Sequence, residues 1–164
     1  MAYKNTVAII GAAGTTGAIL AKAISKCTYR VLLMDQAGKQ LTALQTKIAT
    51  TLPTSEVEVI DCCKDASWEA DVIIISVAKE ELETTAEKMK EVATCKTIIH
   101  FNETGSNNID LQKLLPNSKV VNVYYASINE NSSIYIKAID GIKNEALKMT
   151  REILEEIGLT YNVE

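Results

Sequence analysis

The stretch Thr6–Gly17, TVAIIGAAGTTG, joins a short apolar run to a turn that contains three glycines. The run Thr6–Ile10 is apolar and rich in β-branched residues, which is typical of a buried strand. Beyond the turn, the segment Gly14–Cys27 carries one apolar helical face, made by Leu20, Ala23, Ile24 and Cys27. This order of strand, glycine-rich turn and helix predicts the first unit of a nucleotide-binding α/β fold.

Apolar strands and helical patterns alternate along the rest of the chain, which indicates a parallel sheet with helices on both faces. Further strands are expected at Arg30–Met34, Val57–Ile60, Asp71–Val77, Thr97–Phe101, Lys119–Tyr124 and Ser133–Ala138, with a terminal extended piece at Leu159–Val163. Helices are expected around Leu41, Leu44 and Ile48, from Glu80 onward, over Ile109–Leu115, and over Gly141–Ile157 with Gly158 as its end. The sequence thus predicts a three-layer Rossmann fold with a mostly parallel, doubly wound sheet of six to eight strands.

Composition excludes several other classes of protein. The 164 residues are 47% hydrophobic, and 17 basic side chains stand against 21 acidic ones, so we expect no nucleic-acid partner. The apolar run near Val72–Ala78 is too short to span a membrane, and no signal pattern precedes it. The four cysteines show no C-x-x-C pair, so we expect reduced thiols, no metal site and a cytoplasmic protein. No repeat or linker divides residues 1–164, which predicts a single dinucleotide-binding domain.

The glycine-rich turn has the residues that a diphosphate needs. Gly11 permits a tight turn, Gly14 lets the backbone approach a diphosphate, and Gly17 lets the helix pack against the strand. The candidate binding residues of this segment are Gly11, Ala12, Ala13, Gly14, Thr15, Thr16 and Gly17. The spacing G-x-x-G-x-x-G matches the commoner G-x-G-x-x-G pattern only in part, so a glycine-rich turn without a ligand remains an alternative.

Asp35 ends the second predicted strand and is the candidate for the adenosine ribose. It lies 24 positions beyond Gly11 (35 − 11), near the spacing of about 20 at which an acidic residue binds the ribose hydroxyls. Its charge would repel a 2′-phosphate, and no arginine follows it, although Lys39 is close. The sequence therefore favours NAD over NADP; the alternative is that Asp35 is a plain surface turn residue.

The order of motifs resembles a known family. The glycine-rich turn, the stretch Ala70–Lys79 (ADVIIISVAK), the strand Thr97–Asn102 and the tail Asp140–Val163 resemble the deazaflavin-coenzyme-dependent NADP oxidoreductases, which are related to prephenate and hydroxyacid dehydrogenase domains. The resemblance covers nearly the whole chain and implies a cofactor across the carboxyl ends of the strands. It implies that the nicotinamide would be lined by Val77, Ala78, Lys79, Asn102 and Glu103. Relatives that use NADP carry a basic pair where this chain has Asp35-Gln36, and proline where it has Ala78.

Hydride transfer requires few catalytic side chains, because the protein mainly positions the cofactor and excludes water. The chain's sole histidine, His100, is a weak catalytic candidate as a proton donor; the alternative is a packed strand histidine. The polar loop Asn102–Gly105, with Asn107 and Asn108, follows the fifth strand and could meet a substrate or simply face solvent. No tyrosine precedes a lysine by four positions, so the Tyr-x-x-x-Lys pair of short-chain dehydrogenases is missing.

These features predict an NAD(P)-dependent oxidoreductase, or its nucleotide-binding subunit, that transfers hydride between nicotinamide and an unidentified acceptor. Two alternatives remain open: a non-catalytic NAD(H)-binding sensor or docking module, and a Rossmann-shaped interaction protein without a ligand. Because such domains often complete their substrate pocket with a second domain or copy, a homodimer or a partner subunit is also expected.

Overall fold

The computed structural model describes residues 5–104, 109–126 and 134–159. Its strands form one seven-stranded sheet in the order β3-β2-β1-β4-β5-β6-β7. The strands are β1 (Thr6–Ile10), β2 (Arg30–Met34), β3 (Glu56–Val59), β4 (Val72–Ile75), β5 (Thr97–Glu103), β6 (Lys119–Ala126) and β7 (Tyr135–Gly141). All neighbours pair in parallel except β7, which is antiparallel to β6. The predicted Rossmann fold is confirmed.

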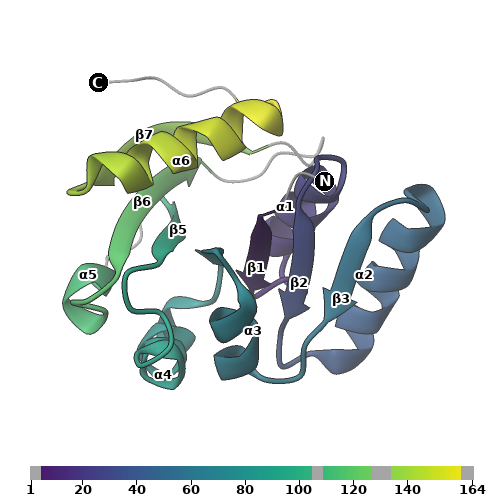
Figure 1. The fold of residues 1–164 in the computed structure, drawn as a ribbon, viewed down its shortest axis with the longest axis horizontal. Coiled ribbons are helices and arrows are strands. Elements are labelled where there is room, and N and C mark those ends of the chain that lie inside the picture. Colours follow the sequence, from purple (N-terminus) through teal and green to yellow (C-terminus); the bar gives the residue numbers. More distant parts are fainter. Residues whose placement is uncertain (1–4, 105–108, 127–133, 160–164) are drawn as a thin grey trace.

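Helices cover both faces of the sheet, as Figure 1 shows. They are α1 (Thr15–Ser25), α2 (Gly38–Thr51), α3 (Cys63–Glu69), α4 (Lys79–Met89), α5 (Leu111–Leu114) and α6 (Asn144–Glu156). Side chains of α1, α2 and α6 pack with one set of strand residues, and those of α3, α4 and α5 with the other. Consecutive residues of β4 illustrate this, since Ile74 joins the first cluster and Ile75 the second.

The strand order places a crevice at the centre of the sheet. The chain runs from β1 outward to β2 and β3, and then returns to the other side of β1 with β4. The helices after β1 and β4 therefore leave on opposite faces, and their loops separate at the carboxyl ends of the two strands. Ligands of open α/β sheets bind at this kind of reversal.

Two local expectations need correction. No helix was expected at Cys63–Glu69, yet this segment forms α3, whose buried residues Cys63 and Ala66 have helical spacing but little apolar bulk. The last helix was expected to begin at Gly141, but α6 begins at Asn144, and Ile142 before it is 77% exposed. The last helix does end as predicted, because Gly158 adopts a φ of +77°. Ser133 and most of the piece Leu159–Val163 lie outside the described residues.

Candidate functional site

The glycine-rich turn owes two of its glycines to packing within the protein. Gly11 has a φ of +91°, and a Cβ added there would lie 2.1 Å from the carbonyl oxygen of Ser76. A Cβ on Gly17 would lie 2.1 Å from the carbonyl oxygen of Gly11. These glycines bring β1, the loop after β4 and α1 close together, as their spacing predicts.

Gly14 is different, because nothing inside the protein requires a glycine there. Its φ is −71°, and an added Cβ would meet just the carbonyl oxygen of Gly11, at the ordinary distance of 3.4 Å. Gly14 is exposed and lines the cleft of about 370 Å³ described below. The missing side chain therefore leaves open space on the ligand side of the turn, beside the start of α1.

The backbone amides of the turn are already bonded within the protein. The N–H groups of Gly11 and Ala12 both donate to the carbonyl oxygen of Met34, at N···O distances of 2.9 and 3.2 Å. Ala13 N–H donates to a carboxylate oxygen of Asp35 at 3.0 Å, and Gly14 N–H donates to the Gly11 carbonyl at 3.1 Å. Of the predicted turn residues, Ala12 is also fully buried. These four consecutive amides are therefore not available to a ligand in this conformation.

Free amides begin one residue later, in the first turn of α1. The first N–H groups of a helix have no intrahelical acceptor, and the first helical bond at this end is Ala18 N–H to the Gly14 carbonyl. The N–H groups of Thr15, Thr16 and Gly17 meet no acceptor within the described parts of the chain. Together with the helix dipole they can receive an anion.

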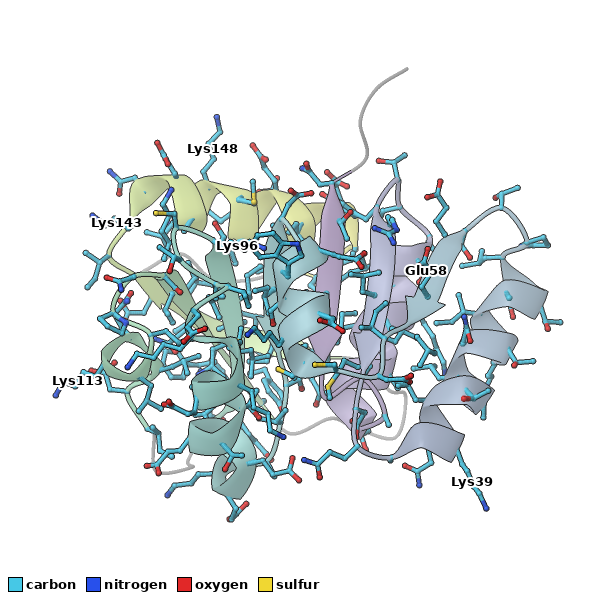
Figure 2. The ribbon with its side chains drawn as sticks, turned by 60° about the horizontal axis from the view of Figure 1, so that its bottom comes forward. Lys39, Glu58, Lys96, Lys113, Lys143 and Lys148 are labelled. Atoms are coloured by element: carbon cyan, nitrogen blue, oxygen red, sulfur yellow. The ribbon has the colours of Figure 1, made fainter. Side chains whose placement is uncertain are left out.

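Asp35 follows β2 and lies against the glycine-rich turn. Besides its bond to Ala13, its second carboxylate oxygen accepts the N–H of Ala37 at 3.0 Å. Asp35 also lines a small cavity of about 30 Å³ with Gly11, Gln36, Cys63 and Val77 among its other lining residues. Lys39 is exposed, and Figure 2 shows it projecting away from the sheet at the start of α2. Asp35 therefore faces this end of the crevice, and the charged residues Glu81 and Lys88 of α4 line the same cavity.

A larger cleft of about 370 Å³ opens at the other end of the crevice. It collects most of the predicted site: Gly14, Thr15, Thr16, Val77, Ala78, Lys79, His100, Asn102 and Glu103 all line it. The structure adds residues that the sequence analysis did not assign to the site, namely Ser76, Leu82, Phe101, Ile109 and Tyr125. The start of α1, the loop after β4, α4, β5 and β6 therefore share one cavity.

Tyr125 connects the two sides of this cleft. It lies on β6, is 9% exposed, and its hydroxyl accepts a hydrogen bond from Thr16 Oγ1 at 3.1 Å. Thr16 lies in the first turn of α1, so the bond joins the helix with the free amides to the strand at the far wall. No local signal in the sequence pairs these residues, which are 109 positions apart.

His100 forms part of the cleft and is 5% exposed. Its Nδ1 lies 3.3 Å from Oδ1 of Asn122 on β6. Burial lowers the pKa of His100 to about 4, although the hydrogen bond to Asn122 acts in the opposite direction. The imidazole is therefore neutral near pH 7, so it can exchange hydrogen bonds with a ligand but carries no charge.

A metal centre and a membrane span have no support in the described residues. Within these ranges, no three His, Cys, Asp or Glu side chains are grouped to hold a metal ion. No described helix combines the length and apolarity needed to cross a bilayer. The cysteines Cys27, Cys62, Cys63 and Cys95 are free thiols.

A family model supports the assignment of the fold. The model for the NADP oxidoreductase, coenzyme F420-dependent family matches residues 6–102, which is more than half of the chain. The chain belongs to this family. The matched part of this F420-dependent NADP oxidoreductase family member contains the glycine-rich turn, Asp35 and His100, whereas Asn122 and Tyr125 lie beyond it. No curated protein sequence matches the chain.

Solved structures share the fold at low sequence identity. A pyrroline-5-carboxylate reductase from Coxiella burnetii superposes with a TM-score of 0.76 at 14% identity, over 99% of this chain and 59% of that one. A pyrroline carboxylate reductase from Plasmodium falciparum with NADP bound gives 0.73 at 13% identity, over 98% and 57%. A protein described as an F420-dependent NADP reductase from Arthrobacter sp. FB24 gives 0.72 at 16% identity, over 96% and 82%. The chain thus spans less than two thirds of the length of the two pyrroline carboxylate reductases.

Proposed function

We propose that this family member binds a pyridine dinucleotide across the carboxyl ends of its strands and acts as an NAD(P)-dependent oxidoreductase, or as the nucleotide-binding part of one. The observation that carries the proposal is the row of free amides at Thr15–Gly17, beside an uncovered Gly14 and a cleft of about 370 Å³. Residues 1–164 would then form one dinucleotide-binding domain.

Each part of the crevice has a task in this proposal. The amides of Thr15–Gly17 bind the diphosphate, and Asp35 accepts hydrogen bonds from the adenosine ribose. Val77, Ala78 and Lys79 after β4 and the end of β5 surround the nicotinamide end and exclude water. The bound dinucleotide supplies or accepts the hydride, so these residues mainly bind and orient.

Gly14→Ala tests the diphosphate site. The new Cβ fits the protein but enters the space left for the ligand, so we expect about tenfold weaker binding of NADH and NADPH. Alanine is a poorer N-cap residue than glycine, so a small loss of stability is also expected. Isothermal titration calorimetry measures the binding. Gly38→Ala makes the same change at the start of α2, where an added Cβ meets nothing within 4 Å, and should bind normally. No heat from the unmodified protein with either dinucleotide would refute the proposal.

We propose further that NAD(H) is preferred over NADP(H), although the family is named for NADP. The Asp35 carboxylate would repel a 2′-phosphate, and Lys39 is exposed and projects away from the sheet. Asp35→Ser is expected to shift the affinity ratio toward NADPH by about tenfold, because removing the charge also removes the repulsion. Fluorescence titration with NADH and NADPH measures both affinities. Asp61→Ser removes another exposed carboxylate, and an equal shift there would exclude a specific role for Asp35.

A second candidate is a non-catalytic NAD(H)-binding sensor or docking module. It is compatible with the coverage, since the chain spans 59% of the Coxiella reductase, and domains of this kind often complete a substrate pocket with a second domain or copy. Mixing the protein with NADH and deazaflavin, flavin or keto-acid acceptors separates the candidates. Loss of absorbance at the nicotinamide band supports the enzyme, and tight binding without turnover supports the sensor.

A further inference from the structure

Three buried or half-buried polar side chains meet where β5 and β6 pass beneath the larger cleft. His100 and Asn102 alternate along β5 and so share one face of the sheet, and the β5–β6 register sets His100 beside Asn122. His100 is 5% exposed and Asn102 is 7% exposed, and both line the cleft. Buried polar groups in a sheet of aliphatic residues need mutual hydrogen bonds, which these three provide.

The hydrogen bonds determine which hydrogen each group carries. The backbone carbonyl of His100 can accept a hydrogen bond but cannot donate one. The Asn102 atom that lies 3.0 Å from it is therefore the amide nitrogen Nδ2. Asn102 Nδ2 also lies 3.3 Å from Asn122, so the Asn122 atom there is the oxygen Oδ1. His100 Nδ1 faces the same oxygen at 3.3 Å and must therefore be the protonated ring nitrogen.

This arrangement leaves acceptors for a ligand. A neutral imidazole protonated at Nδ1 has a lone pair on Nε2, which can accept but not donate a hydrogen bond. Asn102 donates both of its amide hydrogens within the network, so the part of its side chain left for a ligand is the acceptor oxygen Oδ1. A ligand group that donates N–H hydrogen bonds fits this part of the cleft. A carboxylate does not fit, because it can only accept hydrogen bonds.

We propose that Asn122 is a positioning residue that holds His100 as a hydrogen-bond acceptor, so that the cleft selects a carboxamide over a carboxylate on the pyridine ring of the dinucleotide. The inference rests on the proposed function, since it concerns the nicotinamide end of the same ligand. His100 touches the carboxamide N–H₂ in this arrangement, and Asn122 acts through His100. The chemistry required of the ligand is a primary amide.

Other charged or titratable groups line the same cleft and must be considered. Lys79 comes from the start of α4, Glu103 from the end of β5 and Tyr125 from β6. The ammonium of Lys79 would attract a carboxylate and Glu103 would repel it, so ligand preference in the unmodified protein combines these effects. A variant that changes His100 through Asn122 isolates the contribution of the network.

The binding test compares NAD⁺ with nicotinic acid adenine dinucleotide, which carries a carboxylate in place of the carboxamide. We expect the unmodified protein to bind NAD⁺ at least about tenfold more tightly. Asn122→Asp has nearly the same shape but places a negative charge beside Nδ1, which raises the pKa of His100 and, at pH 5, favours a doubly protonated ring whose Nε2 donates. At pH 5 the unmodified imidazole is still neutral, so this variant should reduce the preference measured at that pH to about threefold or less. Asn122→Ser retains an acceptor oxygen and should preserve part of the preference.

A spectroscopic measurement tests the network without any variant. His100 is the chain's sole histidine, so ¹⁵N chemical shifts of one imidazole report its protonation directly. We expect a protonated Nδ1 and an unprotonated Nε2 near pH 7, and a pKa at least one unit higher in Asn122→Asp. A protonated Nε2 in the unmodified protein would overturn the inference even if the variants failed to fold.

The outcomes separate this inference from the function on which it rests. Equal affinity for the two dinucleotides, with the expected imidazole, overturns the carboxamide selection and leaves dinucleotide binding intact. Absence of binding by both dinucleotides overturns the proposed function and this inference together. A preference that stays unchanged at pH 5 in folded Asn122→Asp removes the positioning role of Asn122.

Discussion

Gly11→Ala is expected to lower the free energy of unfolding by about 3 kcal/mol. The new Cβ would lie 2.1 Å from the carbonyl oxygen and 2.7 Å from the carbonyl carbon of Ser76. These are backbone atoms, and Ser76 N–H is bonded to the Ile10 carbonyl at 2.9 Å, so the strand ends cannot separate without breaking the ladder. The φ of +91° adds a conformational cost that any residue with a Cβ would meet.

Urea denaturation followed by circular dichroism measures this change. Gly38→Ala is the matched control, because its added Cβ meets nothing within 4 Å and alanine is the better helix former. The control should keep or slightly raise the unfolding midpoint. If the two variants unfold at the same urea concentration, the contact between the turn and β4 does not constrain the fold as described.

Acid should destabilise the protein through His100 by about 2 kcal/mol between pH 7.5 and pH 5. Burial lowers the pKa of His100 from 6.5 to about 4 in the folded chain. Between these pKa values the unfolded chain binds a proton that the folded chain does not, so stability falls as pH falls through this window. The loss of stability is complete once the pH is below the pKa of His100 in the folded chain, and it is absent above the pKa in the unfolded chain.

His100→Gln provides the comparison. Glutamine cannot titrate, but its amide can still donate to Asn122 Oδ1, so the variant should lose about 2 kcal/mol less than the unmodified protein over the same pH change. Urea unfolding of both proteins at pH 7.5 and pH 5 measures the difference, and effects of the carboxylates cancel between them. Parallel losses of stability would show that His100 already titrates normally in the folded chain.

Much of the fold could be predicted from the sequence because parallel strands buried on both faces have a strong local signal. Val72–Ile75 is apolar throughout and forms β4, and the glycine spacing locates the turn between β1 and α1. Gly17 carries a local signal as well, since the close backbone approach that requires it is to Gly11 and Ala12, whereas the approach that requires Gly11 is to Ser76, which is far away in the chain.

The remaining features depend on contacts that no local pattern contains. Helix α3 escaped prediction because its buried side chains are small, and its aromatic residue Trp68 is 69% exposed. Asn122 gains its role from the β5–β6 register, which brings it beside His100 from 22 positions away. The hydrogen bonds of the turn's amides could not be predicted either, because their acceptors on Met34 and Asp35 are brought to the turn by the fold.

The bonded turn has a thermodynamic consequence for any ligand at the start of α1. Each amide from Gly11 to Gly14 already holds an acceptor before binding, so the segment loses little backbone freedom when an anion arrives. A loose glycine-rich loop would sacrifice about 1 kcal/mol per immobilised residue on complex formation. This preorganisation leaves more of the interaction energy to appear as affinity, and association should proceed without a slow closure step.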